Sequence, residues 1–303
     1  MRRFLAIVKI LLIITVVVFV IFRMGDKANL NVKKDFPFFS TEEYASQYIY
    51  VFDRETGDVI YEKNPQSKTY PASLTKIMTT MVALEHIDDL STIAPIDTET
   101  QSEMFANNAS MAGFNAGESV TYRDLLYGTM LPSGAEAANS LAIHVAGSVE
   151  GFVQMMNDKA VELGLNSTHF TNPEGLHNKD QYTTASDMGK LLDYALNNEH
   201  FKAIFTKETF LTTSTTHHPD GILLKSTVLT SLNKDEQNGF EIIGGKSGTM
   251  DEAGQCWATL GLVDGREYIS IVMGAPLEDI SHPDNKQIAD TLKLYTKIKS
   301  NEL

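Results

Sequence analysis

The stretch Tyr70-Pro71-Ala72-Ser73-Leu74-Thr75-Lys76-Ile77-Met78-Thr79 places a serine and a lysine three residues apart where an apolar run begins. Pro71 favours a helix start, and residues three apart share one helix face, so the Ser73 hydroxyl and the Lys76 amine can meet. A serine becomes a nucleophile when a neighbouring base takes its proton, and a lysine kept neutral by burial or by nearby positive charge can be that base. A helix N-terminus also offers backbone N–H groups to a developing oxyanion. The stretch therefore predicts a nucleophilic Ser-Lys pair.

The Ser-x-x-Lys spacing alone is weak support for that prediction. A second copy, Ser231-Leu232-Asn233-Lys234, stands in a polar stretch that is typical of a loop. Taken by itself, the first copy also fits an ordinary helix start. The remainder of the chain has to decide between the two interpretations.

Composition limits the classes of protein that fit. The 303 residues are 43% hydrophobic and 21% charged, which indicates one large globular domain or two smaller ones. Residues 1–34 hold seven basic residues and one acidic residue, which leaves 18 basic against 38 acidic residues from position 35 onward. This net charge of −20 disfavours nucleic-acid binding.

Cysteine and histidine usage argues against a metal or a disulfide. The single cysteine, Cys256, excludes an intrachain disulfide and a cysteine-cluster metal site, and we expect a buried thiol beside Trp257. The eight histidines form no His-Glu-x-x-His pattern. We therefore expect no metal and no cofactor.

The N-terminus predicts a membrane anchor. Residues 4–22 are apolar apart from Lys9, with basic residues on both sides and no small-x-small cleavage site after them. We expect residues 1–25 to be an uncleaved signal-anchor, residues 26–42 a stalk and residues 43–303 the folded body, placed outside the cell membrane as a single-pass protein. The chain ends at Leu303 shortly after its last predicted helix, so we expect this N-terminal span to be the anchor.

The hydrophobic patterns place strands at both ends of the body and helices between them. Strands are predicted at 47–52, 58–61, 222–224, 240–243, 256–263 and 268–273, and helices from 73 to about 86, then at 122–131, 135–146, 152–163, 184–196 and 285–299. Residues 98–118 read as a loop. The two ends are expected to share one sheet, with a helical lobe at about 77–205 beside it and a cleft between them.

Two further stretches carry chemistry-bearing residues. Leu131-Pro132-Ser133-Gly134-Ala135 puts a hydroxyl in a tight break between two predicted helices. Gly244-Gly245-Lys246-Ser247-Gly248-Thr249 follows a predicted strand, and its glycines permit close approach of a ligand. A helix cap and a simple turn are the alternatives. A phosphate loop is disfavoured, because Phe240 occupies the position of its first glycine and a strand rather than a helix follows.

The order Ser73-x-x-Lys76, then Ser133, then Lys246-Ser247-Gly248 resembles the motif order of penicillin-binding proteins and serine β-lactamases. The neighbouring sequence is similar to low-molecular-weight D-alanyl-D-alanine carboxypeptidases over about residues 45–300, as seen in Ala72-Ser73-Leu74-Thr75-Lys76-Ile77-Met78-Thr79, Ser110-Met111-Ala112-Gly113, Asp124-Leu125-Leu126-Tyr127-Gly128 and Asn172-Pro173-Glu174-Gly175-Leu176. The resemblance implies an α/β (α+β) fold of the β-lactamase/transpeptidase-like type, with an antiparallel sheet built from both chain ends, flanking helices and an inserted helical lobe.

The resemblance also implies catalytic roles. Ser73 would attack the carbonyl between the two terminal D-alanines of a peptidoglycan stem peptide and form an acyl-enzyme that water then hydrolyses. Lys76 would be the general base, and Ser133 would relay a proton toward the leaving amine. Lys246 would supply positive charge that keeps Lys76 neutral.

The third motif would bind the substrate. Lys246, Ser247, Gly248 and Thr249 would form the substrate-binding edge, where Lys246, Ser247 and Thr249 hold the terminal carboxylate. The backbone N–H groups of Ser73 and Thr249 would form the oxyanion hole.

The implied function is a membrane-anchored serine hydrolase of cell-wall (peptidoglycan) biosynthesis and cell shape that binds penicillin and has β-lactams as acylating inhibitors. One departure matters: the second motif of the family ordinarily ends in asparagine, and Ala135 stands there. Asn139 lies one turn further along the helix and is a candidate substitute. Two alternatives stay open, a β-lactamase that uses Glu174 for deacylation and a catalytically impaired wall-peptide binder.

Overall fold

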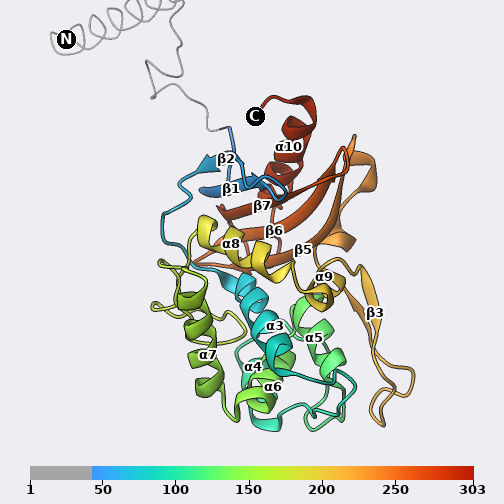
Figure 1. Cartoon of the computed structure of the whole chain (residues 1–303). Helices are drawn as coiled ribbons and strands as arrows, with labels where there is room; N and C mark the ends of the chain where they lie inside the picture. The colour runs from blue at the N-terminus through green and yellow to red at the C-terminus, as the bar shows by residue number, and fades with distance from the viewer. Residues whose placement is uncertain (1–42) are drawn as a thin grey trace, which may run out of the picture. The chain divides into compact units, whose positions relative to one another are not determined.

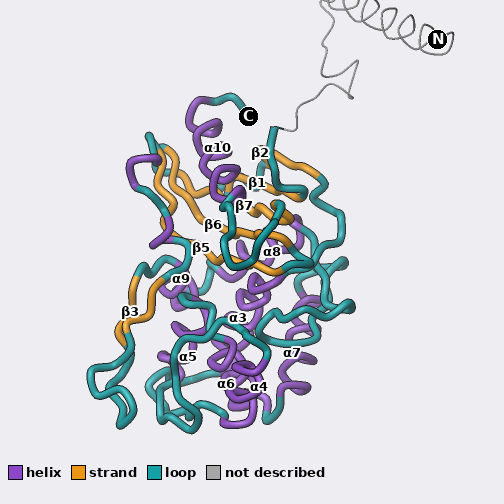
Figure 2. Tube along the Cα trace, turned by 180° about the vertical axis from the view of Figure 1, so that it is seen from behind, coloured by secondary structure: helices purple, strands orange, loops and turns teal. Residues whose placement is uncertain are grey.

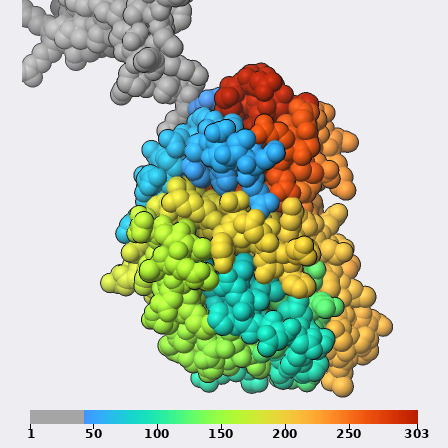
Figure 3. Space-filling model, in the orientation of Figure 1, coloured from blue at the N-terminus to red at the C-terminus, as the bar shows by residue number. Residues whose placement is uncertain are grey.

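A five-stranded antiparallel sheet joins the two ends of the described chain. The computed structural model describes residues 43–303, so the predicted anchor at 1–25 and stalk at 26–42 lie outside the described residues. The strands run in the order β2-β1-β7-β6-β5 (Figure 1), with bounds β1 Tyr48–Asp53, β2 Val59–Lys63, β5 Phe240–Met250, β6 Gly254–Val263 and β7 Arg266–Ala275. The prediction that both ends share one sheet is confirmed. The same neighbourhood is visible on the surface, where early and late segments of the chain lie side by side (Figure 3).

Helices cover both faces of this sheet. Helix α8 (Ala185–Ala195) packs on one face, where Gly189 lies so close to Tyr50 of β1 that an added Cβ would come within 2.8 Å of the ring. Helix α10 (Lys286–Ser300) packs on the other face, where the Tyr295 ring lies even closer to the position that a Cβ on Gly261 of β6 would take. Glycine at these two positions lets helix and sheet approach closely.

The remaining helices form the middle of the chain. They are α3 Thr75–His86, α4 Thr98–Ala106, α5 Tyr122–Met130, α6 Ala135–Ala146, α7 Val149–Glu162 and α9 Glu199–Phe205. Helix α3 is buried along ten of its twelve residues and contacts α5, α6, α7, α8 and α9 (Figure 2). Because an all-round buried helix can shift little, α3 is a rigid support for the residues at its start.

The structure differs from the sequence-based prediction in four places. Helix α4 stands where a loop was expected, and α9 was not predicted. Strands β3 (Thr209–Leu211) and β4 (Leu223–Lys225) form a separate two-stranded sheet. Strand β5 continues through the glycine-rich segment to Met250, because its residues pair with β6 along this length. Short 3₁₀ helices complete the chain: η2 Ala72–Leu74, η3 Leu229–Ser231 and η4 Lys234–Glu236.

Two smaller observations bear on the sequence predictions. Cys256 is a free, fully buried thiol in β6 next to Trp257, as expected, and burial raises its pKa to about 12. Within residues 43–303, every helix is too short or too polar to cross a bilayer.

Candidate active site

Ser73 lies on a strained turn at the entrance to α3. It is the middle residue of η2, one 3₁₀ turn before the α-helix begins. The preceding Ala72 adopts a left-handed backbone conformation with φ of 48°. Its carbonyl accepts a hydrogen bond of 2.8 Å from the Thr75 hydroxyl, which holds the turn in this shape. Strain of this kind costs about 1–3 kcal/mol and is typical of functional sites.

Lys76 is buried and faces Ser73. Its Nζ donates a hydrogen bond of 3.2 Å to Ser73 Oγ and another to the main-chain carbonyl of Glu174. Burial lowers the pKa of Lys76 to about 8, although the carboxylates of Glu174 and Glu136 oppose this shift. Burial is therefore the largest cause of the lowered pKa.

Ser133 and Lys246 form a second hydroxyl-amine pair. Ser133 sits between α5 and α6 with a left-handed φ of 68°, and its Oγ accepts a hydrogen bond of 2.9 Å from Lys246 Nζ. Lys246, on β5, is fully buried, and its Nζ also donates to the Ser247 carbonyl at 2.8 Å. Burial, and then the charge of Lys76, lowers the pKa of Lys246 well below its usual range. The lysines are thus near enough for each to respond to the other's protonation.

Strand β5 lies directly against the nucleophile turn. A Cβ on Gly248 would come within 3.2 Å of the Ser73 nitrogen and 3.1 Å of Ala72 Cβ, so glycine is required for this contact. Ser247 Oγ is hydrogen-bonded to Thr227 Oγ1 at 2.6 Å. Thr227 was not singled out in the sequence, because it lies in a loop without any motif.

A cavity of about 500 Å³ opens over these residues. Its walls combine the nucleophile turn, α6, β5 and three loops, with lining residues Ser73, Lys76, Asn107, Asn108, Ala109, Ser110, Ala135, Glu174, Gly175, Leu176, Thr249, Met250, Ile280 and Pro283. The predicted residues Ser73, Lys76 and Thr249 thus meet at one cavity. Ser133 and Lys246 do not line this cavity, and they are joined to each other by the hydrogen bond from Lys246 Nζ to Ser133 Oγ.

The loop that contains Glu174 closes one side of the cavity. Glu174 is only 5% exposed, and its Oε2 accepts a hydrogen bond of 3.2 Å from Asn139 Nδ2 on α6. Burial raises the pKa of the Glu174 carboxyl, although the Lys76 charge opposes this. The next residue, Gly175, has φ of 90°, and a Cβ there would lie 2.1 Å from the Ala72 carbonyl oxygen. The loop therefore packs backbone to backbone against the nucleophile turn.

Asn139, the candidate substitute for the motif asparagine, lies one turn along α6 and is not among the residues that line the cavity. Its amide donates to the Ala135 carbonyl one helical turn back, at 3.0 Å, and to Glu174. It is therefore tied to the Glu174 carboxylate. Ala135 itself presents only a methyl group to the cavity.

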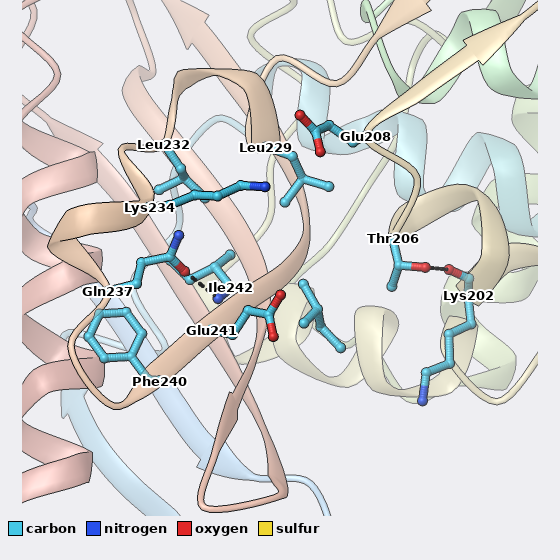
Figure 4. A pocket seen from close by; sticks show the side chains of 11 residues that line it. Lys202, Thr206, Glu208, Leu229, Leu232, Lys234, Gln237, Phe240, Glu241 and Ile242 are labelled. Atoms are coloured by element: carbon cyan, nitrogen blue, oxygen red, sulfur yellow. Dashed lines mark hydrogen bonds between the residues drawn. The ribbon is translucent and has the colours of Figure 1, made fainter.

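A second, larger cavity of about 690 Å³ lies toward the other end of β5 (Figure 4). Phe240, Glu241 and Ile242 form one wall, and Lys234 extends across it. The predicted catalytic and substrate-binding residues do not line this cavity, so we assign the chemistry to the smaller one. Among residues 43–303 the structure brings together no group of three histidine, cysteine or acidic side chains that could hold a metal ion.

The site combines a serine paired with a buried lysine and a second serine-lysine pair that involves strand β5, an arrangement that suits a serine peptidase. Comparison with protein families gives the class directly. A D-alanyl-D-alanine carboxypeptidase family model matches residues 36–277. The chain therefore belongs to the D-alanyl-D-alanine carboxypeptidase family of peptidases.

Curated relatives agree with this assignment. D-alanyl-D-alanine carboxypeptidase DacF of Bacillus subtilis is 31% identical over 226 residues, which are 74% of this chain and 56% of the relative. A D-alanyl-D-alanine carboxypeptidase of Streptomyces sp. K15 is 30% identical over 233 residues, 75% of this chain and 79% of the relative. The chain thus spans little more than half the length of DacF.

Solved structures show the same fold. The Streptomyces K15 DD-transpeptidase superimposes with a TM-score of 0.74 at 28% identity, covering 87% of this chain and 100% of that one. A D-alanyl-D-alanine carboxypeptidase from Mycobacterium tuberculosis H37Rv gives a TM-score of 0.71 at 28% identity, covering 84% and 92%. The predicted β-lactamase/transpeptidase-like fold is confirmed.

Proposed function

We propose that this protein is a serine D,D-carboxypeptidase that removes the terminal D-alanine from peptidoglycan stem peptides through an acyl-serine intermediate, and that penicillin acylates the same serine. The observation that carries the proposal is the Ser73 Oγ–Lys76 Nζ contact of 3.2 Å on the wall of a cavity that strand β5 also lines. A neutral amine in that position can take the serine proton as the hydroxyl attacks a carbonyl.

In this proposal the remaining predicted residues help to protonate the leaving amine, bind the substrate carboxylate and stabilise the oxyanion. When the tetrahedral intermediate collapses, the proton on Lys76 passes to the D-alanine amine by way of Ser133, which leaves Lys76 neutral again. The substrate carboxylate binds beside Lys246 and Ser247, and the arrival of a negative charge raises the lowered pKa of Lys246. The N–H groups of Ser73 and Thr249 stabilise the oxyanion.

The proposal extends to location. The apolar residues 4–22 would anchor the chain in the cell membrane with the catalytic body on the outer side, where the cell wall lies. Protease treatment of intact spheroplasts checks this: loss of the body without lysis supports it, and protection until lysis contradicts it.

One experiment tests the catalytic proposal. Residues 35–303 are incubated with benzylpenicillin and followed by intact mass, beside a Ser73→Ala control, and D-alanine release is measured from a peptide ending in D-Ala-D-Ala. We expect one adduct that the control lacks, together with D-alanine release. An absent adduct with peptide still bound would instead favour a wall-peptide binder in which Ala135 has disabled catalysis.

A transpeptidase is a second candidate, since the chain shares its fold with the Streptomyces K15 DD-transpeptidase. The same peptide with an added amine acceptor separates the two activities. Hydrolysis products would dominate for a carboxypeptidase, and the acceptor adduct would dominate for a transpeptidase.

A further inference from the structure

Glu174 combines three properties that the steps above do not use. It is the one carboxylate among the described residues that line the active-site cavity, it is almost fully buried, and its carboxylate is held by the Asn139 amide at 3.2 Å. Burying a carboxyl group costs folding free energy unless the group is hydrogen-bonded. The Asn139 amide on α6 supplies that hydrogen bond here.

The backbone of Glu174 is also fixed relative to the reacting groups. Its carbonyl accepts a hydrogen bond from Lys76, and the preceding Pro173 carbonyl accepts one of 2.6 Å from Thr79 on α3. Gly175 touches the nucleophile turn on the other side. Glu174 therefore has the same rigid support as Ser73 and Lys76, which a group in the reaction requires.

Ala135 lines the same cavity as Glu174. It stands where an asparagine is usual in the motif, so a methyl group takes the place of an amide at this point of the wall. Asn139 links the two positions, because its amide donates to both the Ala135 carbonyl and Glu174. A water there would have polar partners in the carboxylate and in Lys76, as a bound water requires.

We infer that Glu174 is the general base that activates the hydrolytic water for deacylation of the Ser73 acyl-enzyme. This inference rests on the proposed function and concerns its second half. As the water oxygen forms a bond to the acyl carbonyl carbon, its proton moves to the Glu174 carboxylate. Glu174 then passes that proton to Lys76, and Lys76 donates one to Ser73 Oγ as the ester C–O bond breaks. Every group returns to its starting protonation state.

The raised pKa of Glu174 suits this task. A carboxylate whose pKa lies nearer to neutral is a stronger base than an exposed one, and it is ionised above that pKa. Deacylation should therefore rise with pH through the raised pKa and then level off. Lys76 is expected to control acylation in the same way at a higher pH.

Glu174→Gln tests the inference, because it keeps the shape of the side chain and removes the base. Residues 35–303 of wild type and variant are acylated with benzylpenicillin, and adduct formation and loss are followed separately by intact mass. We expect the acylation rate to stay within about threefold of wild type and adduct loss to slow about 100-fold or more. The matched control is Glu103→Gln, which removes a nearby exposed charge outside the cavity and should leave deacylation unchanged.

Each other outcome contradicts the inference. Wild-type deacylation in Glu174→Gln would exclude Glu174 as the base. Equal slowing of both steps would mean that Glu174 acts only by positioning Lys76. An absence of any adduct on wild type would instead sink the proposed function and the inference with it. If Glu174→Gln does not fold, Glu174→Asp and the wild-type pH profile of deacylation decide, because a profile without a carboxylate-dependent rise contradicts the assignment.

Discussion

Lys246 Nζ donates a hydrogen bond of 2.9 Å to Ser133 Oγ and so connects strand β5 to the break between α5 and α6. This link crosses from the sheet to the helical part of the chain. It places the second serine beside a buried amine just as the first serine lies beside Lys76. The relation gives Ser133 a partner for proton relay, and it makes the backbone shape at Ser133 a separate, testable requirement.

The variants Ser133→Ala and Ser133→Gly separate the effect of the hydroxyl group on acylation from the effect of the backbone conformation on stability. Both variants remove the relay, so acylation by penicillin should fall about 100-fold or more in each. Only alanine is strained at φ of 68°, so Ser133→Gly should be more stable than Ser133→Ala by about 1 kcal/mol. Thermal unfolding and stopped-flow acylation measure the two effects. Acylation at the wild-type rate in either variant would contradict the relay.

The acylation rate should depend on pH through Lys76. Only the neutral amine can accept the Ser73 proton, and the pKa of Lys76 is about 8. The rate should therefore rise about tenfold per pH unit below pH 8 and level off above it. Acylation by benzylpenicillin between pH 5.5 and 9.5 checks this. A flat profile over that range would exclude Lys76 as the base.

The same lowered pKa has a consequence for stability. In the unfolded chain Lys76 has a pKa near 10.5, so between pH 8 and 10.5 the unfolded state binds more protons and the folded state gains stability as pH rises. The burial cost below pH 8 amounts to about 3 kcal/mol. Lys76→Met lacks this titration, so its stability relative to wild type should decline from pH 8 to 10.5. A difference that stays constant in denaturant titrations across this range would contradict the shift.

Most of the sheet could be predicted from sequence, because its strands carry local hydrophobic patterns and the Asp264-Gly265 turn between β6 and β7 has a strong signal. Helix α4 could not, because only Met104 of its nine residues is buried and no apolar period results. The extension of β5 through its glycines was also missed, since pairing with β6 rather than residue preference makes it a strand.

The candidate site was also predictable only in part from the sequence. The serine and lysine positions followed from the order of three short motifs and its resemblance to a known family, and each of these motifs is local in the sequence. The Asn139–Glu174 hydrogen bond joins residues 35 positions apart on a helix and a loop, and no spacing rule relates them. The left-handed conformations of Ala72 and Ser133 were equally invisible, because neither residue type favours φ > 0.

Gly175→Ala should damage the site more than it damages the fold elsewhere. The new Cβ would lie 2.1 Å from the Ala72 carbonyl oxygen, in addition to the strain at φ of 90°. The nucleophile turn must move, so acylation should fall at least tenfold and stability by about 2 kcal/mol or more. Gly57→Ala is the control, because its φ of 77° gives comparable strain with no atom within 4 Å of the new Cβ. Equal acylation rates in the two variants would show that this contact does not position Ser73.

Thr227 should matter for substrate binding through Ser247, whose Oγ it holds at 2.6 Å. Without that bond the Ser247 hydroxyl can rotate away from the substrate carboxylate, so Thr227→Ala should raise the KM for a D-Ala-D-Ala peptide about fivefold to tenfold with a smaller change in kcat. Thr227→Ser retains the hydroxyl and should restore the KM. Thr230→Ala is the matched control, since its hydroxyl bonds only to the Ser226 carbonyl in the same loop. If the KM of Thr227→Ala equals that of Thr230→Ala, the Ser247 hydroxyl is oriented by the strand alone and the Thr227 contact has no part in carboxylate recognition.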